Sequence, residues 1–298
     1  MSTSAAASDA DRAPDQLALG AFAAAVVIGG SNFVAVRFSN RELDPLWGAA
    51  LRFGLAAVVF AVLCAALRLP LPRGRVLALV VAYGLLAFAI AYGCLYWALQ
   101  EVPAGVGAVV LAIGPLLTLV LAALHGLERL TGRAAVGAVV ALVGSVLIFF
   151  QPSEIAFGWQ SLVLLVLAAL SASEAVVVSK RVGRQHPVAM NFVAMSAGAA
   201  ALLVASALAG ERLALPTDRE THLALLYLVA ATVGLFLCVL LVVQRWTASA
   251  TAYIFVLMPV VAAALGALVA DEPITLTTVL GGAIVGAGVY LGALARGS

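Results

Sequence analysis

Charged side chains are scarce in this chain of 298 residues: Asp, Glu, Lys and Arg make up 10% of it, whereas 64% of the residues are hydrophobic and the mean hydropathy is +1.15. A soluble domain carries about 25% charged residues. This chain therefore has too few charges to cover the surface of a water-soluble globule of 30.3 kDa. The composition predicts an all-α polytopic membrane protein, because apolar helices satisfy their own backbone hydrogen bonds inside a bilayer.

Lysine is almost absent, and so are the motifs of common enzymes. Lys180 is the only lysine and is not preceded by glycine, so the chain has no Walker A loop for ATP hydrolysis. No HExxH or GxSxG pattern occurs, and the net charge of +2 gives no reason to expect nucleic acid as a partner. The three cysteines lie in apolar stretches without a CxxC pair: Cys64, Cys94 and Cys238. We expect no enzyme activity, catalytic residue, metal site or cofactor.

What the chain does have is long apolar runs. A spanning helix needs roughly 20 mostly apolar residues. Ten segments meet this requirement: 17–37, 46–67, 76–98, 104–124, 134–150, 158–179, 188–209, 223–243, 248–269 and 275–295. The preceding residues, 1–16, are rich in Ala, Ser and Asp and are expected to form a disordered tail.

The cations predict how these segments cross the membrane, because cytoplasmic loops collect Arg and Lys. With both termini inside, 11 of the 16 cations lie inside, 4 lie outside, and Arg52 lies within a span. The acidic residues have the opposite distribution, with nine outside and four inside. We therefore expect the N and C termini to be cytoplasmic.

The chain also contains an internal repeat, with an offset of 144 residues. Twelve of 55 positions match between 96–150 and 240–294. Pro115, Glu128 and Thr131 meet Pro259, Glu272 and Thr275. The sequence therefore predicts two repeats of five helices each, 17–150 and 151–298. An odd number of helices forces the second repeat to enter the membrane from the opposite side, as in many secondary transporters that work by alternating access.

Several stretches resemble the EamA type of the drug/metabolite transporter superfamily. They are residues 30–37 (GSNFVAVR), 50–53 (ALRF), 96–99 (YWAL), 103–105 (PAG), 114–117 (GPLL), 128–131 (ERLT), 258–261 (MPVV) and 271–275 (DEPIT). The resemblance implies a carrier of small metabolites with ten helices, among whose bacterial members are amino-acid exporters. It also implies a central cavity lined by both halves, with the fifth and tenth helices at the periphery. Residues 171–174 (SASE) depart from the family pattern.

Two charges fall well inside the spans, Arg52 and Glu174. Each costs roughly 2.5–3.5 kcal/mol at the bilayer centre and needs a cavity, a partner or a route to the interface. Arg52 lies about 9 Å from the outer edge, near enough to snorkel, which favours a structural role. For Glu174 our hypothesis is that it faces the cavity and binds a substrate ammonium or takes up a proton. The alternative is a buried glutamic acid that serves only helix packing.

Other candidates for solute contact are polar or aromatic residues within apolar spans. Tyr83 and Tyr227 are related by the offset of 144, and each begins a stripe of residues on one helical face. These stripes predict either that both helices line the solute pathway or that small residues pack the helices against their neighbours. Ser31 and Asn32 are polar residues of the first span, and Tyr253 lies beside Ser249 and Thr251 on the ninth.

Pro115 and Pro259 occupy equivalent positions in the middle of the fourth and ninth spans. Proline removes a backbone hydrogen bond and kinks a helix. Both residues are therefore candidate hinges, with a static kink as the alternative.

These features favour a secondary transporter in a bacterial inner membrane, an exporter of amino acids or related small metabolites that works without ATP. An alternative is a carrier for organic cations or drugs that uses Glu174, and outside transport a membrane scaffold or an intramembrane enzyme. The expected partners are a small-molecule solute and the lipid bilayer. The sequence leaves open the identity of the solute, proton coupling and the oligomeric state.

Overall fold

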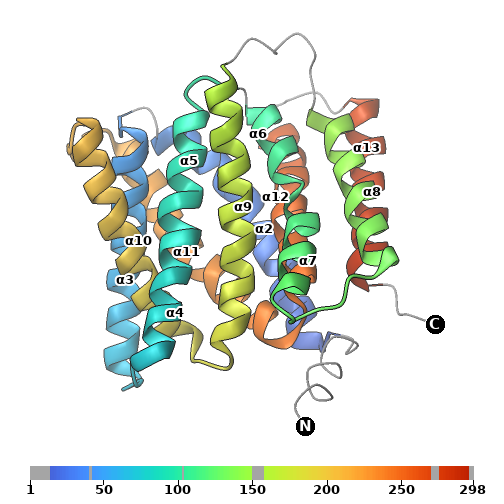
Figure 1. The fold of residues 1–298 in the computed structure, drawn as a ribbon. Coiled ribbons are helices and arrows are strands. Elements are labelled where there is room, and N and C mark those ends of the chain that lie inside the picture. Colours follow the sequence, from blue (N-terminus) through green and yellow to red (C-terminus); the bar gives the residue numbers. More distant parts are fainter. Residues whose placement is uncertain (1–13, 40–41, 103, 150–157, 270–274, 295–298) are drawn as a thin grey trace.

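The computed structural model describes residues 14–39, 42–102, 104–149, 158–269 and 275–294, and these residues form helices without any strand. The predicted tail and the loop that carries Asp271 and Glu272 lie outside this part of the chain, except for residues 14–16. The first half contains α2 (Gln16–Ser39), α3 (Pro45–Ala66), α4 (Gly74–Gly84), η1 (Leu85–Ile90), α5 (Ala91–Ala98), α6 (Ala104–Leu111), α7 (Gly114–Leu124) and α8 (Gly132–Phe149). The second half contains α9 (Trp159–Val182), α10 (Pro187–Ala209), α11 (Arg219–Arg245), α12 (Ala248–Val269), α13 (Leu276–Val289) and η3 (Tyr290–Leu294). Figure 1 shows these helices packed side by side in one bundle.

Eight of the described helices are long and apolar enough to cross a membrane. Two shorter apolar helices, Gln16–Asn32 and Gly132–Ile148, lie where the sequence predicts the first and fifth spans. The molecule is therefore a multi-pass membrane protein. That all ten segments cross the bilayer stays a prediction.

The third and fourth predicted spans contain irregularities. The third changes from α-helix to the π-helix η1 and back, through Gly84 and Ala91. The fourth is broken at Ala112 and Ile113, so Pro115 lies in the first turn of α7 and not in the middle of a helix. Proline suits a first turn because its missing N–H has no partner there in any case. Pro259 lies within the uninterrupted helix α12, so the two prolines are not structurally equivalent.

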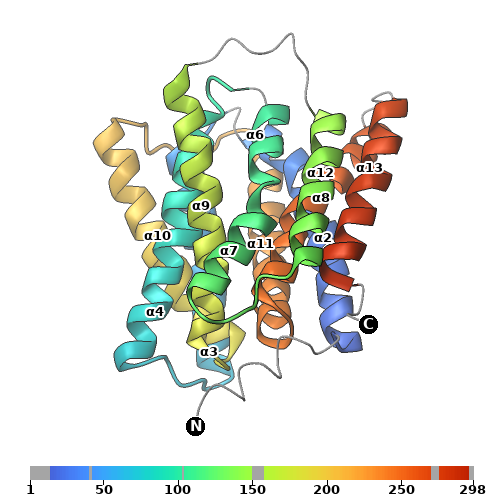
Figure 2. The same ribbon diagram turned by 45° about the vertical axis from the view of Figure 1, so that its right-hand side comes forward.

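Equivalent helices of the two halves run in opposite directions. Asp15, at the start of α2, pairs with Arg245 at the end of α11. Lys180, near the end of α9, donates through Nζ to the carbonyl of Val243, also near the end of α11. The first residues of α2 and the last residues of α9 therefore lie at the same end of the bundle (Figure 2). This is the inverted arrangement that the repeat predicts.

The contacts between the halves are reciprocal, as a two-fold axis requires. A Cβ on Gly137 of α8 would lie 2.8 Å from the Gly288 carbonyl oxygen of α13, and one on Gly281 would lie 2.7 Å from the Gly144 carbonyl oxygen. With the offset of 144, Gly137 corresponds to Gly281 and Gly144 to Gly288. The two contacts are thus copies of each other, and helix backbones meet directly at both.

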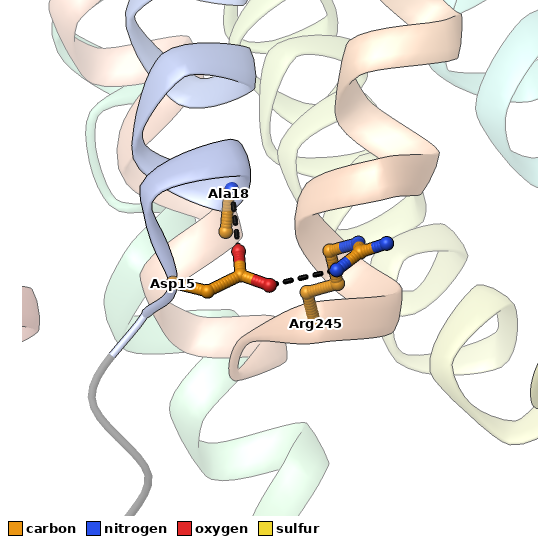
Figure 3. A network of polar contacts seen from close by, with 3 residues as sticks. All are labelled: Asp15, Ala18 and Arg245. Carbon is orange, nitrogen blue, oxygen red and sulfur yellow. Dashed lines mark hydrogen bonds and ion pairs between the residues drawn. The ribbon is translucent and has the colours of Figure 1, made fainter.

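A polar contact joins the beginning of α2 to the end of α11 (Figure 3). Asp15 Oδ1 accepts from the Ala18 amide at 2.7 Å, and Oδ2 accepts from Arg245 Nη1 at 2.7 Å. The amide, and then Arg245, hold the pKa of the Asp15 carboxyl below its ordinary value. The charged Asp15 carboxylate therefore stabilises the fold at pH values above the ordinary pKa of a carboxyl group. This stabilisation is lost as the pH falls through the lowered pKa.

Replacing Asp15 with Asn should remove the ion pair and keep a side-chain acceptor for Ala18. We expect Asp15→Asn to lower the melting temperature slightly at pH 7, because exposed ion pairs contribute little. The difference from the unmodified protein should shrink as the pH falls through the lowered pKa of Asp15, because the carboxyl is then protonated and the ion pair is lost. Melting curves of the purified protein from pH 3 to pH 7 would check this, and a difference that does not change with pH would contradict it.

Glu128, one of the residues that the internal repeat matches, caps α12 from the loop between α7 and α8. Its carboxylate accepts hydrogen bonds from the amides of Ala248 and Ser249 and from the Ser249 hydroxyl. These amides belong to the first turn of α12, where backbone donors have no partner within the helix. The repeated glutamate therefore has a structural role that joins the two halves.

We expect Glu128→Ala to destabilise the protein by about 1–2 kcal/mol, the usual cost of losing a helix cap. Glu128→Gln should recover part of the loss, because one side-chain oxygen can still accept. Reversible unfolding of the purified protein in mixed micelles would measure both variants. Equal stability of the Ala variant and the unmodified protein would refute the capping role.

Candidate functional site

A cavity of about 210 Å³ lies between the two halves. Its described lining comes from α2, α3, α4 with η1 and α5, α6 with α7, α9, α11 and α12. Helices α8, α10 and α13 contribute none of these residues. The lining is mostly apolar, with a few polar groups, which is the usual composition of a small-molecule site.

The cavity follows the pseudo-two-fold axis of the bundle. Seven pairs of described lining residues are related by the offset of 144: Gly29 and Ser173, Asn32 and Val176, Ala91 and Leu235, Tyr92 and Phe236, Leu95 and Val239, Leu111 and Phe255, and Gly114 and Met258. The cavity therefore lies where both repeats present the same helical positions. In secondary transporters built from inverted repeats, the substrate site lies at this kind of interface.

The two tyrosines that the repeat relates lie in different surroundings. Tyr83 is buried and lines the cavity, whereas Tyr227 is 44% exposed on the outside of α11 and does not line it. The third span contains the π-helix η1 between Tyr83 and Tyr92, while α11 is an uninterrupted α-helix. A π segment adds residues to a turn and rotates what precedes it. The structure therefore places Tyr83 at the cavity and Tyr227 outside it, although the repeat relates them.

Arg52 is buried and lines the cavity. Its side chain is 3% exposed, and its Nε donates to Thr232 Oγ1 of α11 at 2.6 Å. The guanidinium carbon also lies 5.4 Å from the ring centre of Phe53. Arg52 therefore does not snorkel to the membrane edge, because it points into the bundle and bonds to the other repeat.

Glu174 is not among the described cavity-lining residues, contrary to the expectation that it faces the cavity. Its Oε1 lies 3.4 Å from His125 Nε2 at the end of α7. The cavity face of α9 includes Ala169, Ala172 and Val176, at spacings of three and four. Two residues after Ala172, Glu174 points about 200° around the helix from it. The structure thus pairs Glu174 with a histidine away from the cavity.

Of the remaining candidates for solute contact, Asn32 is among the described lining residues, whereas Ser31 and Tyr253 are not. Ser31 accepts a hydrogen bond from the Tyr227 hydroxyl at 2.5 Å, so these two residues form a pair outside the lining. Tyr253 is 2% exposed and packs beside Gly292 in the contact between α12 and the last helix. Its hydroxyl has no hydrogen-bond partner in the described part of the chain. The structure therefore brings together Asn32, Tyr83 and Arg52 and separates them from Ser31, Tyr227 and Tyr253.

The cavity is also lined by residues that the sequence did not indicate, chiefly Tyr92, Tyr96 and Thr118. Tyr92 and Tyr96 are four residues apart and so share a helical face. Tyr92 is also the repeat counterpart of Phe236, a pairing of aromatic residues that could have identified both. No sequence signal pointed to the contact between Arg52 and Thr232, because it depends on how α3 and α11 cross.

Comparison with known proteins agrees with this architecture. The EamA-like transporter family matches the chain twice, over residues 16–150 and 159–293. The "Probable amino-acid metabolite efflux pump" of Escherichia coli K12 is 29% identical over 282 residues, covering 89% of this chain and 91% of that protein. The "Uncharacterized inner membrane transporter YedA" of the same strain is 27% identical over 259 residues, covering 86% and 84% respectively. A solved crystal structure has a similar fold, with a TM-score of 0.79, 18% identity, and coverage of 94% of this chain and 98% of that one.

Proposed function

Because this chain belongs to the EamA-like transporter family, we propose that it is a secondary exporter of amino acids or closely related small metabolites. Transport would proceed by alternating access, with the two repeats rocking about the cavity and without ATP. The protein would lie in a bacterial inner membrane with both termini in the cytoplasm, where its cations are concentrated. The name of the Escherichia coli efflux pump supports the class of solute.

The observation that carries the proposal is the cavity between the inverted repeats. Its volume of about 210 Å³ is below the roughly 300–1,000 Å³ of sites for drug-sized ligands. A solute of amino-acid size suits this volume better than a large drug does. The seven symmetric pairs of lining residues also allow each repeat to form either the inner or the outer wall of one site.

The geometry gives no support to the alternative of a cation carrier that uses Glu174. The described lining contains no carboxylate, and its one formal charge is the guanidinium of Arg52. A permanent cation would therefore meet a positive charge in the cavity without an acidic partner.

A counterflow experiment tests the proposal. Purified protein in liposomes preloaded with one unlabelled amino acid should take up the same labelled amino acid faster than liposomes without protein. The panel should cover acidic, basic, small and apolar amino acids together with two organic cations. Exchange of at least one amino acid, without ATP, is the expected result. Exchange of the cations alone, or of no solute, would refute the proposed class.

A further inference from the structure

The symmetric cavity is chemically asymmetric. At two pairs of repeat-related lining positions the first repeat supplies a polar or hydroxylated residue and the second an apolar one: Asn32 and Val176, and Tyr92 and Phe236. Thr118 is a further polar lining residue of the first repeat, whereas the hydroxyls that the second repeat contributes, those of Ser173 and Ser179, donate to backbone carbonyls. The arginine, Arg52, also comes from the first repeat. The cavity thus has a polar wall from the first half and a more apolar wall from the second.

Arg52 belongs to the polar wall and has no acidic partner among the residues that the structure describes. No carboxylate oxygen of the described residues lies within 4.0 Å of its guanidinium, and its only hydrogen bond to them is the one from Nε to Thr232. A buried charge without a counter-charge is costly, so a structural arginine is normally paired. An anion bound in the cavity would supply the missing counter-charge.

The orientation of Arg52 suits a carboxylate in particular. Thr232 occupies Nε, and neither Nη1 nor Nη2 hydrogen-bonds to another described residue. Two parallel N–H groups match the two oxygens of a carboxylate, the arrangement that makes such pairs strong and directional. Thr232 belongs to α11 of the second repeat, so it fixes the guanidinium across the interface.

The opposite wall suits an apolar substituent. Leu235, Phe236 and Val239 of α11 line the cavity beside the alanines of α9. An amphipathic solute could therefore place its carboxylate at Arg52 and its side chain against the second repeat, where burial is favourable by about 25 cal/mol per Å² of apolar area.

We propose that Arg52 anchors the carboxylate of the transported solute, and that the cavity selects carboxylates with an apolar side chain over the corresponding amines. This inference rests on the proposed function and specifies the substrate class of the same site. An ammonium group is tolerated but is not the recognised element, because the described lining has only neutral acceptors for it. The oxygens of Asn32 and Thr118, which lack partners in the described structure, are two of these.

The test uses three compounds with one side chain: leucine, its carboxylic acid 4-methylpentanoate and its amine isopentylamine. Each is added at the same concentration to the purified protein in detergent, and the melting temperature is recorded. A ligand that binds the folded state raises this temperature by mass action. We expect leucine and the acid to stabilise the protein and the amine not to do so.

Variants then assign the effect to Arg52. Arg52→Gln should weaken binding of leucine and of the acid by at least about tenfold, because it removes both the charge and the paired donors. Thr232→Val keeps the charge of Arg52 but removes the hydrogen bond that fixes its guanidinium, and should weaken binding severalfold. This variant also tests the role of Arg52 if Arg52→Gln does not fold. The control is Arg219→Gln, the same substitution at an exposed position at the start of α11, which should bind as the unmodified protein does.

The outcomes separate this inference from the proposed function. Stabilisation by the amine equal to that by the acid, no stabilisation by either carboxylate, or unchanged binding in both variants would overturn the role of Arg52. Any of these could occur while counterflow still shows amino-acid transport. Conversely, binding of carboxylates that depends on Arg52, without counterflow of any amino acid, would support the anchor and refute the proposed transport function.

Discussion

Ala172→Phe should reduce transport by on the order of tenfold or more while leaving the protein folded. Ala172 lies on the cavity face of α9, and the larger side chain would project into a space of only about 210 Å³. A bound solute and a phenyl ring cannot occupy the same volume in a closely packed interior. Counterflow of the amino acid that the unmodified protein exchanges best, measured in proteoliposomes, checks this result.

Leu170→Phe is the matched control. Leu170 lies two residues earlier on α9, is 40% exposed and does not line the cavity. The same ring should therefore face outward and leave the transport rate close to that of the unmodified protein. Equal rates for the Ala172 and Leu170 variants, with equal amounts of folded protein, would show that the solute does not pass through this cavity.

The second large effect concerns the crossing of the third span with α10. Gly84, the last residue of α4, has no room for a side chain: a Cβ there would lie 2.1 Å from the Ala194 carbonyl oxygen and 2.6 Å from its Cα. On the other side of this contact, a Cβ on Gly198 would lie 2.5 Å from Phe88 Cβ. The atoms nearest to a Cβ on Gly84 belong to the Ala194 backbone, and Phe88 Cβ, next to Gly198, is bonded directly to its own backbone. The helices must therefore separate if either glycine gains a methyl group.

We therefore expect Gly84→Ala to lower the free energy of unfolding by about 3 kcal/mol, at the upper end of the usual cost of overpacking. Gly20→Ala is the control, because a Cβ at that position of α2 meets nothing within 4 Å. Alanine favours an α-helix over glycine by up to about 1 kcal/mol, so the control should be neutral or slightly stabilised. Unfolding in mixed micelles compares the two variants, and equal stabilities would refute the close contact.

The sequence predicted the positions of most helices because hydropathy and proline mark them well. The predicted segment 46–67 became Pro45–Ala66, and 188–209 became Pro187–Ala209. Proline at the first or second position begins each helix, since its fixed φ suits that turn. The inverted arrangement was also predictable, because an odd number of helices in each repeat forces it.

The interruptions were not predictable in the same way. The π-helix η1 lies in a run of Leu, Ala, Phe and Ile that reads equally well as α-helix. This segment packs against α9 and α10, and local sequence does not encode such tertiary contacts. An irregularity near Pro115 could be expected from the sequence. That it divides the span into two separate helices could not.

The candidate site was predictable only in part. Asn32 and Arg52 were singled out because a polar or charged residue within an apolar span needs a partner, and Tyr83 because the repeat relates it to Tyr227; all three line the cavity. Glu174 met the same criterion but lies beside His125, a partner nearly fifty residues away in sequence that only tertiary structure brings close. Polarity within a span therefore identifies residues that need a partner, but the packing of the helices decides whether that partner is a solute or another side chain.

One measurement tests most directly whether the cavity between the repeats is the transport site. In a variant without Cys64, Cys94 and Cys238, Ala172→Cys places a single thiol on the cavity face of α9. A membrane-impermeant maleimide is applied to one side or the other of oriented vesicles, with or without the transported amino acid. Alternating access predicts labelling from both sides and slower labelling when the amino acid is present. Labelling from one side only, or at a rate that the amino acid does not change, would contradict it.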